Sequence, residues 1–235
     1  MVNIVKKFED WFEGMDKTVS SSTIKRLLKA AGFRWRRVRK SLESQRDMLM
    51  YAFFKEEIRL LQQEHEQQKI RLVFYDESGI SLNPNSVYAW LPKDCSAKLP
   101  AMRGNIMTIA GFMQIDNTTM MYTHEGSTTS EIFIAYVDDY LINSPSLMKT
   151  IVIIDNASFH KSAQVRKKMI EWKSKNLYFQ FLPPYCSELN KIETLWHHIK
   201  HLWLKIEDYQ SKQSLENAVI NILKNIKLKY TISFN

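Results

Sequence analysis

The sequence predicts an α/β fold, in which a mixed sheet is flanked by helices and preceded by a small all-helical unit. In residues 69–235, short apolar runs alternate with amphipathic helical patterns, an order typical of parallel strands covered on both faces. Within residues 1–40, the periodicity of the chain up to Gly32 is helical, and a charged pattern without Gly or Pro over residues 41–68 predicts a connecting helix. We therefore expect boundaries near residues 40 and 68.

The N-terminal unit is expected to be a helix-turn-helix with a basic arm. An apolar stripe predicts a first helix that ends at Gly14. Ser22 is expected to cap a second helix over residues 23–31, and Gly32 is expected to terminate it. Basic and apolar residues alternate in the segment that follows, as in an arm along a phosphate backbone. Many other helical pairs share this pattern, so it is not diagnostic alone.

The positive charge of the chain is concentrated in the same unit. Residues 17–40 contain nine basic residues and no acid. Removing these nine from the chain's 33 basic residues leaves 24 against 25 acidic ones, although the net charge is +8. Such a block favours a nucleic-acid partner over a merely solvated helix face. The candidate DNA-binding residues are Thr23, Lys25, Arg26, Lys29, Arg34, Arg36, Arg37, Arg39 and Lys40.

The remaining elements follow from hydrophobic spacing and from turn residues. The apolar side of the connecting helix consists of Met50, Phe53, Phe54, Ile58 and Leu61. Asp116-Asn117 is expected to form a hairpin turn, and Pro183-Pro184 is expected to end the last strand before the helix that follows it. Strands are expected over 71–76, 105–115, 118–124, 150–155 and 177–182, and helices over about 128–142, 161–175, 190–206 and 212–228.

Three carboxylates stand beside the buried strands of this domain. Asp76 and Asp155 each end an apolar run, and Glu193 lies at the start of the helix that follows a third run. Parallel strands bring their carboxyl ends to one edge of a sheet, so the three acids are expected to meet there. Taken singly, the two aspartates could begin turns, and Glu193 could complete a capping box with Asn190.

Clustered carboxylates repel one another unless a cation lies between them, so the arrangement predicts a divalent metal site. Three acids suffice for two Mg²⁺ ions if one aspartate bridges them. Helical spacing puts Glu193 at the border of its helix's apolar stripe, where it can face a cleft while the helix remains packed. These residues indicate metal-assisted phosphoryl chemistry.

Four segments carry a more specific pattern, namely residues 74–79 (FYDESG), 88–90 (YAW), 154–160 (IDNASFH) and 182–196 (LPPYCSELNKIETLW). They resemble the DDE transposases of the mariner-like superfamily, and within it the branch of the bacterial insertion sequences. The similarity extends over essentially the whole chain, and the last segment is the most specific. Two positions depart from the family: Cys186-Ser187 stands where Ser-Pro is usual, and Lys191 where Pro or a small apolar residue is common.

The resemblance implies an RNase H-like fold for residues 69–235. It assigns a catalytic and metal-binding triad to Asp76, Asp155 and Glu193, with 37 residues between the last two. It also implies two Mg²⁺ ions, for which Mn²⁺ can substitute.

Other polar residues near these motifs receive weaker assignments. Asn156 and His160 match the family motif and are candidates for orienting the substrate or the triad, although a purely structural role suits His160 equally well. Glu77 is a third residue of this kind. The surface acids are expected to be Asp94, Asp138 and Asp139.

The activity that the resemblance implies is DNA transposition. The enzyme would cleave the terminal inverted repeats of an insertion sequence and join the freed 3′-OH to target DNA at a TA dinucleotide, as a homodimer in a synaptic complex. Two alternatives stay open: a catalytically silent DNA-binding antagonist of the full-length transposase, and another RNase H-like endonuclease. Family members usually carry a further helix-turn-helix, so a truncated chain or one product of a split gene is expected.

Composition argues against several other classes of protein. No apolar stretch reaches the roughly 18 residues that span a bilayer, and the N-terminus lacks the apolar core of a signal peptide. We therefore expect a cytoplasmic, DNA-associated bacterial protein. The two cysteines, Cys95 and Cys186, show no CxxC or Cys/His spacing, so the sequence supports neither a zinc site nor a disulfide framework.

Overall fold

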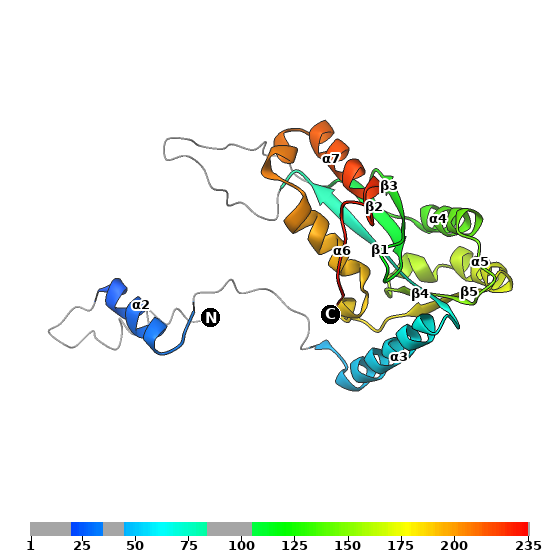
Figure 1. Ribbon diagram of the computed structural model, residues 1–235, viewed down its shortest axis with the longest axis horizontal. Coiled ribbons are helices and arrows are strands. Elements are labelled where there is room, and N and C mark those ends of the chain that lie inside the picture. The colour runs from blue at the N-terminus through cyan, green and yellow to red at the C-terminus, as the bar shows by residue number, and fades with distance from the viewer. Residues whose placement is uncertain (1–19, 35–44, 84–104, 235) are drawn as a thin grey trace. The chain divides into compact units, whose positions relative to one another are not determined.

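The computed structural model describes residues 20–34, 45–83 and 105–234 (Figure 1). The chain divides into two compact units, residues 1–42 and 43–235, and each is described by itself. The predicted first helix, the arm residues 35–40 and the stretch from residue 84 to 104 lie outside the described residues. The helix-turn-helix therefore stays a prediction.

α2 (Ser21–Ala30) is the helix described in the first unit. Its N-cap is Ser20 and not the predicted Ser22, and the Ser20 hydroxyl accepts a hydrogen bond from the Thr23 N–H at 3.3 Å. Each of the three consecutive serines is able to cap, and capping at the first lets two more residues join the helix. The end at Gly32 is confirmed: its φ is 81°, and a backbone hydrogen bond of 2.8 Å closes a Schellman motif.

The second unit contains a five-stranded sheet in the order β3-β2-β1-β4-β5. Its strands are β1 (Arg71–Ser81), β2 (Asn105–Met113), β3 (Thr119–His124), β4 (Thr150–Ile154) and β5 (Leu177–Phe181). β1 pairs with β2, and β2 with β3, in antiparallel fashion. β4 pairs with β1 and with β5 in parallel fashion. The predicted mixed sheet is confirmed.

Both faces of the central strands are buried, which explains why their sequences are continuously apolar. In β1, Leu72 and Phe74 belong to one core cluster, whereas Val73 and Tyr75 belong to another on the opposite face. Side chains alternate along a strand, so the two acids that follow Tyr75 are also directed to opposite faces. This alternation sets the geometry of the candidate site.

Helices cover both faces of the sheet (Figure 1). On the face of Val73 lie α4 (Ser130–Asn143) and α5 (Ala163–Ser174). On the face of Leu72 lie α3 (Met48–Glu66), α6 (Ile192–His198) and α7 (Lys212–Lys224). Among the described residues, no helix combines the length and the hydropathy needed to cross a membrane.

The apolar side predicted for α3 is partly wrong. Met50 and Phe53 are 44% and 61% exposed. Each directly precedes a residue that packs on the core, Tyr51 or Phe54, so the prediction included two exposed residues and omitted Tyr51. The core-facing residues of α3 are Tyr51, Phe54, Ile58 and Leu61.

The helix predicted over residues 190–206 is interrupted. α6 passes into a π-helix, η4 (Ile199–Trp203), and a 3₁₀-helix, η5 (Ile206–Gln210), follows. The Leu204 N–H bonds to the Ile199 carbonyl at 3.1 Å, an i to i+5 step that marks the wider turn. Because a π-turn rotates the following side chains relative to an α-helix, Leu202 is 60% exposed, although it continues the helical apolar spacing of Leu195 and Ile199.

The predicted hairpin turn at Asp116-Asn117 is confirmed, and its side chains also form hydrogen bonds with the C-terminal segment. Asn117 adopts the left-handed conformation, with a φ of 63°. Its side chain donates to the Ile232 carbonyl at 3.0 Å and accepts from the Ile232 N–H at 2.8 Å. Asp116 accepts a hydrogen bond from Lys227 Nζ at 2.7 Å. The turn therefore holds the C-terminal segment against the sheet.

Candidate active site

Asp76 lies in the interior of β1 and not, as predicted, at the end of the strand. Polar residues continue the strand to Ser81 because they pair with β2. The pairing of β1 with β4 stops at Phe74, opposite Ile153. Asp76 thus lies two residues beyond the last β1 residue that pairs with β4, and alternation directs it to the face covered by α6. It does not begin a turn.

Asp155 lies at the carboxyl end of β4, as predicted, although the strand ends one residue before it and not at it. Continuing the parallel register by two residues from Phe74 and Ile153 sets Asp155 beside Asp76. Its Oδ1 accepts hydrogen bonds from the Ala157 N–H at 3.0 Å and from His160 Nδ1 at 2.9 Å. The residue therefore does shape a turn, and its half-exposed carboxylate also lines a pocket.

Glu193 lies in the first turn of α6, half-buried at the border of the helix's apolar side, as predicted. The alternative, a capping box with Asn190, is not formed. The Asn190 side chain is buried and donates instead to the Tyr75 carbonyl at 2.8 Å. This bond ties the start of α6 to β1, one residue before Asp76, and so brings the third acid to the first.

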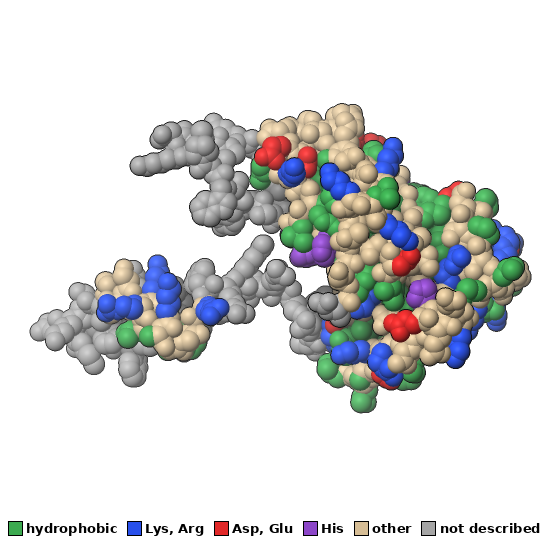
Figure 2. Space-filling view, viewed as in Figure 1, with side chains coloured by type: hydrophobic (Ala, Val, Ile, Leu, Met, Phe, Trp, Pro, Cys, Tyr) green, Lys and Arg blue, Asp and Glu red, His purple; other side chains and the backbone are tan. Residues whose placement is uncertain are grey.

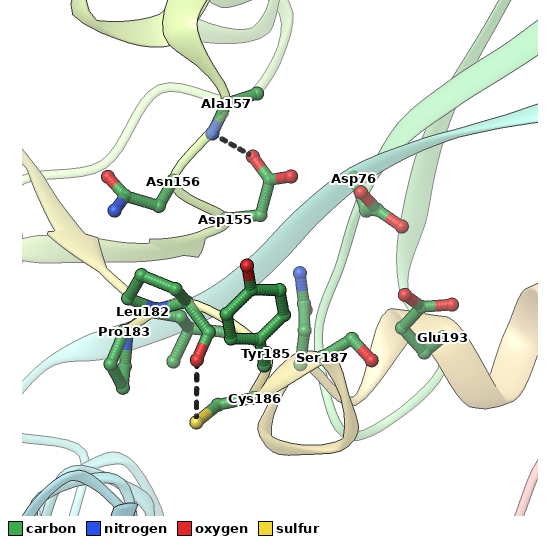
Figure 3. A pocket seen from close by; sticks show the side chains of 12 residues that line it. Asp76, Asp155, Asn156, Ala157, Leu182, Pro183, Tyr185, Cys186, Ser187 and Glu193 are labelled. Atoms are coloured by element: carbon green, nitrogen blue, oxygen red, sulfur yellow. Dashed lines mark hydrogen bonds between the residues drawn. The ribbon is translucent and has the colours of Figure 1, made fainter. Parts of the chain in front are cut away.

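The three acids line one pocket of about 370 Å³ (Figure 3). Figure 3 shows the carboxylates of Asp76 and Glu193 pointing toward each other, with Asp155 across the opening. Residues 182–187, which follow β5, line the pocket from another side. At about 30 Å³ for each water molecule, the volume suffices for a phosphate group and several waters.

The electrostatics of the pocket disfavour negative charge. Burial, and after it the charges of Glu193, Glu77 and Asp155, raise the pKa of Asp76 well above its ordinary value of 3.8. The hydrogen bond that Trp196 Nε1 donates to Asp76 Oδ2 at 2.9 Å opposes this increase without cancelling it. Burial also raises the pKa of Glu193. A cation in the pocket would relieve this repulsion.

His160 bridges Asp155, which lines the pocket, and Glu77, which is not among the lining residues. It is fully buried beside the rings of Phe133 and Phe159. Its Nδ1 bonds to Asp155, and its Nε2 lies 3.2 Å from Glu77 Oε1. Burial disfavours the charged imidazole, but the bonds to the two acids outweigh it and raise the pKa of His160. The bond to His160 in turn lowers the pKa of Asp155 against the effect of burial.

The donor chemistry of the pocket fits a hard divalent cation such as Mg²⁺, which prefers carboxylate oxygens and keeps several waters. As the side chains stand, however, no group of three or more His, Cys, Asp or Glu among the described residues could hold a metal ion. One oxygen of Asp76 and one of Asp155 are engaged by Trp196 and His160. The three acids are therefore gathered around one pocket without forming a closed ligand set.

Two departures from the family pattern lie in the loop before α6. Cys186 is a buried free thiol that donates to the Pro184 carbonyl at 3.4 Å. Lys191 is the N-cap residue of α6, with helical backbone angles. Cys95 lies outside the described residues.

The remaining acidic and polar candidates occupy different positions. Asn156 is exposed at the rim of the pocket. Asp138 and Asp139, expected on the surface, are half-buried and have structural partners. Asp138 accepts from Trp172 Nε1 at 2.7 Å, and Asp139 accepts from the Tyr122 hydroxyl at 3.0 Å. Asp94 lies beyond the described residues.

The candidate DNA-binding residues belong to the first unit. Figure 2 shows Lys and Arg side chains gathered on its described part. Thr23 is half-buried, and its hydroxyl lies 3.0 Å from that of Ser20. The exposed members are Lys25, Arg26, Lys29 and Arg34, whereas Arg36, Arg37, Arg39 and Lys40 lie outside the described residues.

Sequence reasoning missed two residues beside the acids. Trp196 bonds to Asp76, and Lys200, in the π-helix, donates to Ser78 Oγ at 2.7 Å. Burial lowers the pKa of Lys200, against the attraction of Glu193 and Asp76. The spacing contained a signal for both, because positions three and seven after Glu193 lie on the same side of a helix.

Comparisons with known proteins bear on this geometry. A family model described as "DDE superfamily endonuclease" matches residues 71–216. A search of the curated proteins found no similar sequence. Among solved structures, the "Mos1 transposase paired-end complex with left transposon end" matches with a TM-score of 0.59 at 14% identity, over 96% of this chain and 71% of that one.

Two further solved structures match less well. They are the "Mos1 mariner paired end complex with Mn", with a TM-score of 0.53 over 93% of this chain and 71% of that one, and the "Mos1 Strand Transfer Complex", with 0.52 over 94% and 72%. Both are 12% identical to this chain. These similarities show a shared fold, the RNase H-like fold of transposase catalytic domains. Because the family model spans more than half of the sequence and includes all three acids, the chain belongs to the DDE superfamily of endonucleases.

Proposed function

We propose that the protein is a Mg²⁺-dependent DNA transposase of an insertion sequence. The observation that carries the proposal is the meeting of Asp76, Asp155 and Glu193 around one pocket, in a chain of the DDE family. One solved structure with this fold is a transposase in complex with a transposon end, which supports the choice of substrate.

In the proposed reaction, water hydrolyses phosphodiesters at the ends of the element, and the freed 3′-OH then attacks target DNA at a TA dinucleotide. Asp76, Asp155 and Glu193 would hold two Mg²⁺ ions, or Mn²⁺ in their place. When bound, the ions would supply Lewis-acid polarisation of the scissile phosphate and a lowered pKa for the attacking water.

The protein's other residues would orient the acids and bind the substrate. His160, fixed by Glu77 on its far side, would hold the carboxylate of Asp155, and Trp196 would hold that of Asp76. Asn156 lies at the rim, where a DNA strand would pass. The basic residues of the first unit would bind the terminal inverted repeats of double-stranded DNA. A homodimer is proposed because two ends must be processed together.

The test is a nicking assay on a labelled duplex that carries the inverted repeats flanking the gene. With Mg²⁺ or Mn²⁺, we expect the wild type to nick the duplex. The nicking rate of Asp155→Asn should be at least about 100-fold lower, because the variant loses a carboxylate that stabilises the transition state. Calorimetric titration with Mn²⁺ should show weakened metal binding in the same variant. The matched control is Glu171→Gln, which removes an acid paired with Lys168 and Lys175 on the surface of α5.

The same assay separates the competing functions. Binding of the duplex without metal-dependent nicking would leave the DNA-binding antagonist. Nicking without a joined product would leave an endonuclease that does not transfer strands. Equal nicking by the wild type and Asp155→Asn would rule out the proposed triad.

A further inference from the structure

The loop after β5 places an exposed aromatic ring at the pocket. It joins β5 to the 3₁₀-helix η3 (Ser187–Leu189) and lines the pocket over residues 182–187. Tyr185 is 46% exposed, whereas its neighbour Cys186 is 2% exposed. In Figure 3 the Tyr185 ring stands among the pocket residues, with its hydroxyl directed to the side where Asp155 and Asp76 lie. Nearly half of this side chain is therefore available to a bound molecule.

The backbone of Tyr185 adopts a conformation that its side chain disfavours. Its φ is 62°, in the left-handed region, which a residue with a large side chain rarely occupies. Among the described non-glycine residues with positive φ, it is the only aromatic one. Such a conformation persists only where surrounding contacts enforce it, and residues of this kind cluster at binding sites.

Arg46 supplies the enforcing contacts. Its Nε and Nη2 both donate to the Tyr185 carbonyl, at 3.0 and 2.9 Å. Nη2 also forms a 2.5 Å ion pair with Glu188, and the guanidinium carbon lies 4.4 Å from the centre of the Tyr51 ring on α3. The side chain is only 10% exposed. The planar guanidinium thus fixes the loop through the backbone of Tyr185 and leaves its ring free toward the pocket.

We propose that Tyr185 stacks on a nucleobase of the DNA strand end that enters the pocket, and that Arg46 is the residue that positions it. The proposal rests on the proposed function, since it takes DNA as the occupant of the pocket. The three carboxylates repel phosphates in the absence of a cation, so charge alone does not hold a strand there. Stacking on an aromatic ring needs no charge and tolerates any base.

The test uses a duplex with a 3′ overhang of three nucleotides that contains 2-aminopurine, in EDTA, with a blunt duplex for comparison. The wild type should quench the fluorescence on binding, and Tyr185→Phe should retain the quenching. Tyr185→Gly should lose the quenching and weaken overhang binding by about 5- to 100-fold, with blunt-duplex binding unchanged. Glycine adopts a φ near 60° without strain, so this variant removes the ring and keeps the loop.

The matched control is Phe53→Ala, which removes an exposed aromatic ring of α3 that does not line the pocket. It should leave the quenching unchanged. Arg46→Ala should reduce the quenching and accelerate amide exchange in residues 185–188. Arg46→Lys should restore only part of the quenching because lysine lacks the planar fork.

Quenching and affinity that are unchanged in Tyr185→Gly would overturn the stacking role, and an unchanged Arg46→Ala would overturn the positioning role. The nicking assay reports separately on the proposed function. Normal quenching by a wild-type protein that never nicks DNA would overturn the transposase and leave the stacking site. Nicking by a wild-type protein that does not quench the fluorescence would overturn the stacking site and leave the transposase.

Discussion

His160 is a single residue that serves packing and the pocket together. Its ring fills a position among aromatic side chains, and both of its nitrogens meet carboxylates that come from different elements. Glu77 reaches it because alternation in β1 turns that acid away from the face of Asp76. A structural role and an orienting role for His160 are therefore compatible.

We expect His160→Gln to change the pH dependence of stability in the metal-free protein. The pKa of His160 is raised above 6.5, so the folded protein binds its proton more tightly than the unfolded chain does. This contribution is present in full below pH 6.5 and is lost as the pH rises through the raised value. The urea midpoint of the wild type should fall in that range, and the midpoint of the variant should fall less.

The neighbouring acid sets the opposite limit. The lowered pKa of Asp155 contributes stability above pH 3.8 that is lost as the pH falls through the lowered value. Between the pKa values of Asp155 and His160, His160→Gln should lower the free energy of unfolding by about 1–3 kcal/mol. The variant removes the imidazole that is the partner of the largely buried Glu77 carboxylate. Parallel pH profiles for wild type and variant would contradict the assignment.

At the scale of elements, the β2–β3 hairpin stabilises the C-terminal segment through its turn. We expect Asn117→Ala to lower the free energy of unfolding by about 2–4 kcal/mol, because it removes two hydrogen bonds to Ile232 and places a Cβ-bearing residue without polar atoms at a φ of 63°. Asn117→Gly keeps the backbone relaxed and should lose less. Urea unfolding measures both.

A second asparagine provides the control for this hairpin prediction. Asn176 has a φ of 61° but is exposed, and its side chain makes one long hydrogen bond of 3.4 Å, to the Leu147 carbonyl. Asn176→Ala should lower the free energy of unfolding by only about 1 kcal/mol, the backbone strain alone, because it removes no buried hydrogen bond. A loss as large as that of Asn117→Ala would show that backbone conformation, and not the bonds to Ile232, carries the effect.

Sequence patterns predicted the elements better than their ends. Continuous apolar runs identified β1, β4 and β5, because burial on both faces leaves a clear signal. The extension of β1 past Asp76 was not predictable, since pairing with β2 satisfies a polar stretch that by itself is typical of a loop. The π-turn at Ile199 was missed for a related reason: apolar spacing does not distinguish a helix from a slightly wider one.

The candidate site was likewise predictable in part. The meeting of the three acids was predictable from the topology of parallel strands. The residues that hold them, Trp196 and His160 among them, depend on which face each strand position takes and on helix packing. Arg46 and Tyr185 are 139 positions apart in the sequence, so no local sequence pattern predicts their contact.

At the scale of the whole molecule, charge and chemistry occupy different units. Residues 17–40 hold the excess of basic residues, whereas the three acids of the pocket belong to residues 43–235. An acidic pocket repels the polyanion on which it is proposed to act. Affinity for DNA should therefore depend on the basic unit, and cleavage on the acids, so the two properties should be separable by mutation.

We expect replacement of Lys25, Arg26 and Lys29 together by alanine to weaken DNA binding most at low salt. Each lost phosphate contact reduces the slope of log K against log salt by about 1, so the triple variant should lose up to about 3. Nicking at saturating DNA should stay within about twofold of the wild type, because the three acids are unchanged. The control is the replacement of three exposed lysines of the second unit, Lys205, Lys224 and Lys229. Equal slopes for the two triple variants would show that net charge, and not the basic unit, determines DNA binding.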